Sequence, residues 1–132
     1  MKILLVEDDQ RVVEATKVLI QSLTTGIIDF TVASDKDGAT RRAVTERFDA
    51  MVLDLKLPDS PEPTSTLDAF NELMEYLPTV VVSGYADSHI SMLAIEHGAM
   101  GCVLKADLDS MKDAFKELLV RARREKEEAT GG

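Results

Sequence analysis

Short apolar runs recur five times along the chain, separated by stretches that are richer in polar residues. These runs predict β-strands over residues 2–6, 30–33, 50–55, 79–83 and 101–104. The first, third and fourth runs are nearly continuous in Val, Ile, Leu and Met and do not alternate with polar residues. Continuous apolar strands are typical of a parallel sheet whose two faces are both covered.

Apolar residues at helical spacing follow each predicted strand and indicate five helices. Their apolar stripes are Val12, Ala15, Leu19 and Leu23; Ala39, Ala43 and Phe48; Leu67, Phe70, Leu73, Met74 and Leu77; Ile90, Leu93 and Ala94; and Leu108, Met111, Phe115, Leu118, Leu119 and Ala122. Asp35 and Asp107 are expected to cap the second and fifth helices, and Ser65 with Asp68 resembles a capping box for the third. Gly98 is the expected left-handed terminator of the fourth helix.

Strand and helix thus alternate five times, which implies right-handed crossovers between parallel strands. The predicted fold is a doubly wound α/β domain, a parallel sheet with helices on both faces. A chain of 132 residues is long enough for one such domain and its hydrophobic core. We expect residues 1–124 to form the domain and residues 125–132 to form a flexible polar tail.

The chain carries a formal net charge of −9. This charge repels nucleic acids and anionic membranes, so direct binding to either is not expected. The single cysteine, Cys102, cannot form an internal disulfide bond. The first residues lack a signal-peptide pattern, and no apolar stretch approaches the roughly 20 residues that a membrane-spanning helix needs. We therefore expect a cytoplasmic protein.

Polar residues of matching chemistry stand where four of the predicted strands end. They are Glu7 and Asp8 after the first strand, Asp54 in the third, Ser83 in the fourth and Lys105 after the fifth. In open parallel sheets, ligands bind at this edge. Each residue alone has an ordinary explanation, as a helix cap or a solvated charge. Asp54 is harder to explain in that way, because it lies inside an apolar run and no helix begins directly after it.

Three carboxylates at one edge, those of Glu7, Asp8 and Asp54, repel one another unless a cation lies among them. Oxygen ligands without a nearby His or Cys favour Mg²⁺. Lys105 and the hydroxyl of Ser83 are suited to hold the oxygens of a phosphoryl group. A carboxylate nucleophile such as Asp54 would form a reactive acyl phosphate, which suits a reversible signal.

The acid pair Glu7-Asp8, Asp54 in Val-Leu-Asp-Leu-x-Leu-Pro, Ser83 and Lys105 occur in this order along the chain. With these motifs the sequence resembles the response-regulator receiver family. The resemblance implies a flavodoxin-like fold with strand order 2-1-3-4-5. It also implies that Asp54 accepts a phosphoryl group from a histidine kinase or a histidine phosphotransfer protein.

The resemblance also implies the roles of the other site residues. Glu7, Asp8, Asp54 and the backbone carbonyl of Lys56 would hold Mg²⁺, with Asp8 as the more direct ligand of the acid pair. Ser83 would be the switch hydroxyl, and Lys105 the lysine that binds the phosphoryl group. Output would pass to a downstream protein, or to a second copy of the chain, through the face formed by the fourth helix, fifth strand and fifth helix.

Three positions depart from the family pattern. Ala106 replaces the proline that usually follows the lysine, often through a cis bond, and the loop after Pro58 lacks the usual glycine. Cys102 stands where the family usually has an aromatic residue. Cys102 is too small to fill the space of such a ring, so either the coupling of the switch is weaker or another side chain such as Tyr85, just beyond Ser83, carries it. A further interpretation is that Cys102 serves only as part of the core.

Three other readings of the same residues are open. A phosphohydrolase of the haloacid dehalogenase type would also form an aspartyl phosphate, but it needs a second Asp where this chain has Lys56. A flavodoxin-like cofactor binder would need a glycine-rich phosphate loop after the first strand, which this chain lacks. The third is a receiver-shaped interaction module that is never phosphorylated, against which the complete set of site residues argues.

Overall fold

Five parallel strands form a single sheet in the computed structural model, which describes residues 1–84 and 88–130. The strands are β1 (Lys2–Val6), β2 (Asp29–Ala33), β3 (Ala50–Asp54), β4 (Thr79–Ser83) and β5 (Gly101–Leu104). Their order across the sheet is β2-β1-β3-β4-β5, and every neighbouring pair is parallel. The predicted strands and the predicted strand order are both confirmed.

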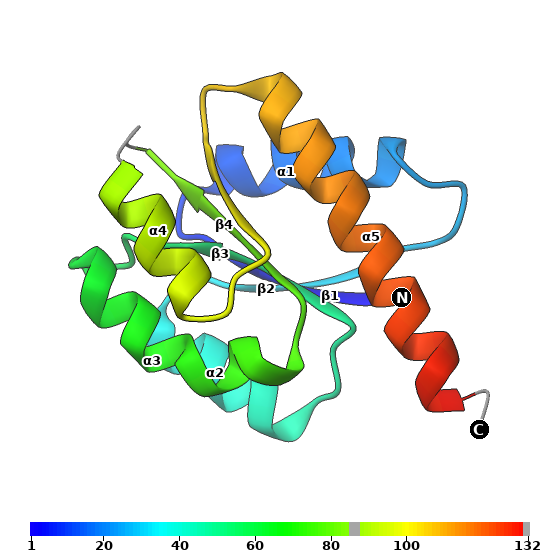
Figure 1. Ribbon diagram of the computed structural model, residues 1–132, viewed down its shortest axis with the longest axis horizontal. Coiled ribbons are helices and arrows are strands. Elements are labelled where there is room, and N and C mark those ends of the chain that lie inside the picture. The colour runs from blue at the N-terminus through cyan, green and yellow to red at the C-terminus, as the bar shows by residue number, and fades with distance from the viewer. Residues whose placement is uncertain (85–87, 131–132) are drawn as a thin grey trace.

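Helices cover both faces of the sheet (Figure 1). They are α1 (Gln10–Ser22), α2 (Lys36–Thr45), α3 (Pro63–Tyr76), α4 (Ser88–Glu96) and α5 (Leu108–Thr130). Leu4 and Val6 of β1 pack in a core with residues of α2, α3 and α4, whereas Ile3 and Leu5 pack in a second core with residues of α1 and α5. Both faces of the strand are therefore buried, which explains its unbroken apolar sequence.

The buried face of α1 differs from the predicted stripe. Val13, Thr16 and Ile20 are buried, whereas Ala15 is exposed and Val12 is only half-buried. Ala is more hydrophobic than Thr, so the sequence pattern predicts a buried face that is shifted by one residue from the observed one. Leu108 is a similar case, since it lies at the start of α5 and is 55% exposed.

The predicted capping box of α3 is wrong. The helix begins at Pro63, with Glu62 as N-cap and no side-chain capping bond. Proline is well suited to the first helical position, because the missing N–H would have no partner there. Ser65 and Asp68 therefore lie inside the helix.

The other predicted helix ends are confirmed. Gly98, just beyond α4, has a φ of 109°, in the region that favours glycine. The side chain of Asp35 accepts a hydrogen bond from the backbone N–H of Gly38, and that of Asp107 accepts one from Ser110. Each aspartate thus caps the helix that follows it.

α5 is longer than the sequence pattern predicts, because residues 125–130 continue the helix. Arg121 pairs with Glu125 at 3.1 Å, and Lys126 pairs with Asp49 at 3.5 Å. The last turns lack an apolar stripe, and these ion pairs are contacts that they make instead. The division into a domain of residues 1–124 and a tail stays a prediction. In the part of the chain that the structure describes, no helix combines the length and the apolar character needed to cross a membrane.

Candidate metal centre

The C-terminal edge of the sheet brings three carboxylates together. Glu7 and Asp8 directly follow β1, and Asp54 is the last residue of β3, the neighbouring strand. One oxygen from each side chain lies within 4.8 Å of the other two. Glu7 and Asp54 are buried, and Asp8 is exposed. The cluster therefore opens to solvent on the side of Asp8.

Lys105 lies against two of these carboxylates. Its Nζ is 2.7 Å from Glu7 Oε1 and 3.3 Å from Asp54 Oδ2. Burial disfavours the charged amine, but the hydrogen bond to Glu7 and the charges of both carboxylates outweigh it and raise the pKa of Lys105. Lys105 is therefore a cation at neutral pH.

Both oxygens of Glu7 already have protein partners. Oε1 forms an ion pair with the ammonium of Lys105. Oε2 accepts hydrogen bonds from the backbone N–H groups of Asp8 at 3.0 Å and Asp9 at 3.3 Å. Burial and the neighbouring Asp54 nevertheless raise the pKa of Glu7. These contacts orient Glu7 and make it a poorer candidate for direct coordination than Asp8.

The donor set fits a hard divalent cation. All three clustered side chains offer carboxylate oxygens, which Mg²⁺ prefers in proteins. Partial desolvation and the nearby Glu7 raise the pKa of Asp8, the expected result for a carboxylate beside another carboxylate. A bound divalent cation would remove this repulsion.

Lys56 and Ser83 lie next to the cluster. The backbone N–H of Lys56 donates to Asp54 Oδ1 at 3.2 Å, which fixes the start of the loop beside the carboxylate. Ser83, the last residue of β4, is buried, and its carbonyl oxygen accepts a hydrogen bond from the N–H of Lys105 at 2.8 Å. All the residues that the sequence singles out for phosphoryl and metal chemistry thus lie at this edge of the sheet.

The predicted switch residues are only partly described. Cys102 lies in β5 opposite Val81 of β4, is half-buried, and has a pKa raised by burial. Tyr85 lies outside the described residues. The switch role of Ser83, Tyr85 and Cys102 stays a prediction. The bond between Lys105 and Ala106 is trans, since no cis peptide bond occurs in the described ranges.

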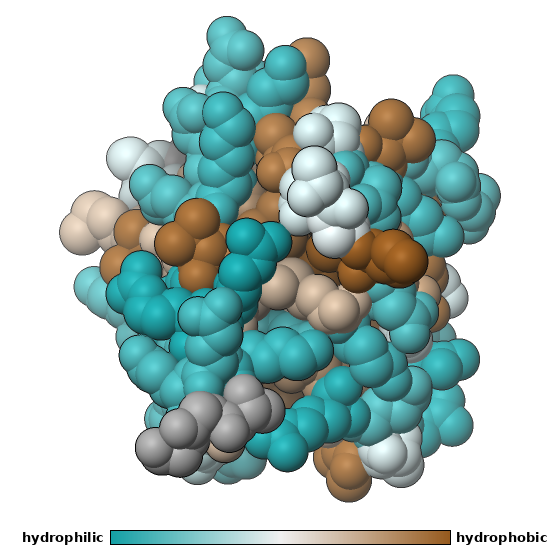
Figure 2. Space-filling model, turned by 90° about the vertical axis from the view of Figure 1, so that its right-hand side faces the viewer, coloured by the Kyte–Doolittle hydropathy of each residue, from teal (hydrophilic) through white to brown (hydrophobic). Residues whose placement is uncertain are grey.

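A hollow of about 920 Å³ lies at the opposite end of the sheet, lined by residues of the α2–β3 connection, the end of α3 and the last turns of α5. Figure 2 shows this end of the molecule, where hydrophilic side chains dominate. Two of the acidic residues that line the hollow pair with lysines: Glu46 lies 3.2 Å from Lys2, and Asp49 lies 3.5 Å from Lys126. Among the described residues, the group that brings three carboxylate oxygens within 4.8 Å of one another is Glu7, Asp8 and Asp54, so their edge of the sheet is the better candidate for a cation site.

One carboxylate that contacts another element near the site was missed by the sequence analysis. Asp59, in the loop between β3 and α3, accepts hydrogen bonds from the first backbone N–H groups of α2. Its place after Pro58 indicates a turn, but the sequence does not show which groups the side chain meets.

Comparisons with known proteins agree with this arrangement. The family model of the response regulator receiver domain matches residues 3–116. None of the curated proteins compared with the chain matches it significantly.

Solved receiver domains share the fold over nearly the whole chain. The CheY-like receiver domain protein of Methanospirillum hungatei JF-1 has a TM-score of 0.75 at 25% identity, covering 94% of this chain and 97% of that one. The receiver domain of the Francisella response regulator 1452 has a TM-score of 0.75 at 21% identity, covering 93% and 97%. A receiver domain protein from Clostridium thermocellum has a TM-score of 0.73 at 18% identity, covering 92% and 96%. With a family model that matches most of its length, the chain belongs to the response regulator receiver family.

Proposed function

We propose that this receiver domain accepts a phosphoryl group on Asp54 from a histidine kinase or a histidine phosphotransfer protein. The observation that carries the proposal is the position of Asp54, which lies buried between the ammonium of Lys105 and the acid pair. Membership of the receiver family supports the same role. The function would be regulatory, since the chain would act chemically only on its own phosphorylation state.

In the proposed transfer, an Asp54 carboxylate oxygen attacks the phosphorus of a phosphohistidine. The new O–P bond forms as the N–P bond breaks, and the imidazole leaves and takes up a proton. Mg²⁺, when bound, would neutralise charge on the phosphoryl oxygens. Lys105 would move from the carboxylates to these oxygens, and the hydroxyl of Ser83 would donate to another.

Asp8, Asp54 and the backbone carbonyl of Lys56 are the groups that we propose for holding Mg²⁺. Glu7 would contribute mainly by charge and by orienting Lys105, because its two oxygens already have partners. Three carboxylates are then balanced by a divalent cation and one ammonium. Phosphorylation adds roughly one further negative charge. Lys105 is the cation best placed to balance this added charge.

We propose that output passes through the face formed by α4, β5 and α5, to a downstream protein or to a second copy of the chain. Met92 and Ile95 of α4 support this choice, because these apolar side chains are 61% and 56% exposed. A cytoplasmic location, where kinases and their partners meet, is part of the same proposal.

The test is the intact mass of the protein after incubation with acetyl phosphate and Mg²⁺. Wild type should gain one phosphoryl group, and removal of Mg²⁺ by a chelator should prevent the gain. Asp54→Asn should gain none, whereas the control Asp49→Asn, at the opposite end of the sheet, should behave as wild type. An undiminished adduct on Asp54→Asn would rule out the assignment, and continuous phosphate release over many turnovers would favour a phosphohydrolase.

A further inference from the structure

The loop between β3 and α3 contains a tight turn close to the metal centre. Leu57 and Ser60 exchange backbone hydrogen bonds of 3.1 and 3.0 Å, which places Pro58 and Asp59 at the tip of the turn. Lys56, whose carbonyl is a proposed metal ligand, directly precedes this turn. The geometry of the turn therefore bears on the geometry of the metal centre.

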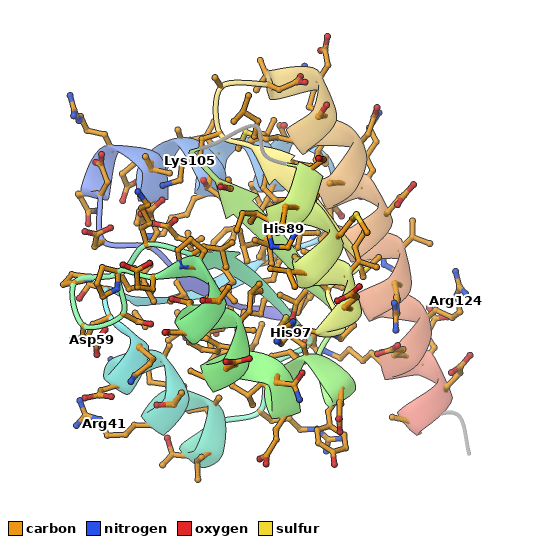
Figure 3. The ribbon with its side chains drawn as sticks, turned by 60° about the vertical axis from the view of Figure 1, so that its left-hand side comes forward. Arg41, Asp59, His89, His97, Lys105 and Arg124 are labelled. Carbon is orange, nitrogen blue, oxygen red and sulfur yellow. The ribbon has the colours of Figure 1, made fainter. Side chains whose placement is uncertain are left out.

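Asp59 ties the tip of the turn to α2. Its Oδ1 accepts a hydrogen bond from the N–H of Lys36 at 2.8 Å, and its Oδ2 accepts one from the N–H of Asp37 at 3.0 Å. Figure 3 shows Asp59 beside the start of α2. These hydrogen bonds lower the pKa of Asp59, so its carboxylate is ionised at neutral pH.

The start of α2 is therefore capped from two different elements. The third helical N–H, of Gly38, donates to Asp35 Oδ1 at 2.6 Å, and Ala39 makes the first regular backbone bond of the helix, to the carbonyl oxygen of Asp35 at 3.1 Å. Asp59 meets the first and second. The first three N–H groups of a helix have no acceptor within the helix, and here all three are satisfied.

The other side of the loop is held by α3. Thr66 Oγ1 lies 2.9 Å from the carbonyl oxygen of Leu55 and 2.7 Å from Ser60 Oγ, and both hydroxyl side chains are buried. Lys56 thus lies between an anchor on α3 and an anchor on α2. Its own N–H donates to Asp54 Oδ1 at 3.2 Å.

We propose that Asp59 is a positioning residue, which fixes the loop that carries Lys56 against α2 and so sets the geometry of the metal centre. The inference rests on the proposed Mg²⁺ site. Through Asp59, the start of α2 is linked to the edge of the sheet that carries the proposed metal centre.

The test is a magnesium titration of the full chain. Calorimetry measures the affinity, and the NMR signal of the Lys56 backbone amide reports on the loop. Asp59→Ala should weaken Mg²⁺ affinity about tenfold, in the range found for residues that orient metal ligands. Its phosphorylation rate should return to the wild-type value at saturating Mg²⁺. Asp59→Asn, which keeps one acceptor oxygen, should fall between Asp59→Ala and wild type.

The matched control is Asp35→Ala, which removes a cap from the same helix but has no contact with the loop among the described hydrogen bonds. It should lower thermal stability and leave Mg²⁺ affinity within about twofold of wild type. Equal loss of affinity in Asp35→Ala and Asp59→Ala, or no loss in either, would overturn the role of Asp59 and leave the proposed function standing. Failure of wild type itself to bind Mg²⁺ would overturn both.

Discussion

The ammonium of Lys105 lies 2.7 Å from Glu7 and 3.3 Å from Asp54, so that one cation links two buried carboxylates from neighbouring strands. This lysine compensates for the burial of both acids. The same side chain would lie beside the phosphoryl group that we propose for Asp54. Its removal should therefore affect stability, metal affinity and phosphorylation in different directions.

Lys105→Ala should slow phosphorylation of Asp54 about 100-fold, because a donor to the phosphoryl oxygens is lost. It should also tighten Mg²⁺ binding roughly a few-fold, because a positive charge next to the metal ligands is gone. Acetyl phosphate kinetics and calorimetric titration measure the two effects. Lys116→Ala, which removes the same charge from an exposed position on α5, should change neither. Weaker Mg²⁺ binding in Lys105→Ala would contradict this account.

Asp8 and Asp9 should have separate roles although they are adjacent. Asp8→Ala should weaken Mg²⁺ binding, because Asp8 belongs to the carboxylate cluster. Asp9 is the N-cap of α1 and accepts a hydrogen bond from the N–H of Arg11 at 2.9 Å. Asp9→Ala should therefore cost about 1 kcal/mol of stability and leave Mg²⁺ affinity nearly unchanged. Urea unfolding and Mg²⁺ titration of both variants test this, and equal loss of affinity would show that the acid pair is misplaced.

His97 joins the end of α4 to α3 through both ring nitrogens. Nδ1 lies 2.7 Å from the carbonyl oxygen of Leu93, and Nε2 lies 2.8 Å from Asp68 Oδ1 (Figure 3 shows His97 where α4 ends). Both partners accept hydrogen bonds, so the doubly protonated ring satisfies both. The hydrogen bond to Asp68 is the main cause that raises the pKa of His97 above its ordinary 6.5.

A raised pKa in the folded state means that the charged ring of His97 adds to stability. This contribution is complete below the ordinary pKa and is lost as the pH rises through the raised one. The loss should stay below about 1 kcal/mol, because Asp68 is 75% exposed. Urea unfolding at a series of pH values measures it. In an NMR titration, Asp68→Asn should lower the pKa of His97. The variant His89→Gln serves to assign the two histidine signals. An unchanged pKa of His97 in Asp68→Asn would refute the contact.

Gly98→Ala should destabilise the protein by about 1–3 kcal/mol. Its φ of 109° is unfavourable for any residue with a Cβ, and that atom would lie 3.3 Å from the carbonyl oxygen of Met74. Gly101→Ala is the matched control, since an added Cβ there meets no other atom within 4 Å. Urea unfolding should separate the two variants clearly. Equal stabilities would mean that the chain beyond α4 adopts another conformation.

The strands and the edge at which the site lies were predictable because they depend on local patterns and on the handedness of crossovers, whereas the strand order was implied by the resemblance to the receiver family. Continuous apolar runs mark buried parallel strands, and Asp54 within one of them marks the site. Gly98 and Asp107 were predictable for a related reason. Each satisfies a requirement of its own helix end, whatever packs against it.

The features that were missed depend on partners far away in the sequence. Thr16 rather than Ala15 faces the core of α1, and only the packing of the helix on the sheet decides this. Asp59 caps a helix that begins 23 residues earlier, a contact that no local pattern encodes. The last turns of α5 persist with the help of Lys126, whose partner Asp49 precedes β3.

The sheet also separates the interior into two compartments, since Leu4 and Leu5 are adjacent in sequence but lie in different cores. Phe70 fills the compartment beneath α3, and Phe115 fills the one beneath α5. Substitutions at distant sites without shared neighbours combine additively. The effects of Phe70→Leu and Phe115→Leu on unfolding should therefore sum in the double variant. Each helical layer can then be redesigned, or can drift in sequence, without compensation in the other.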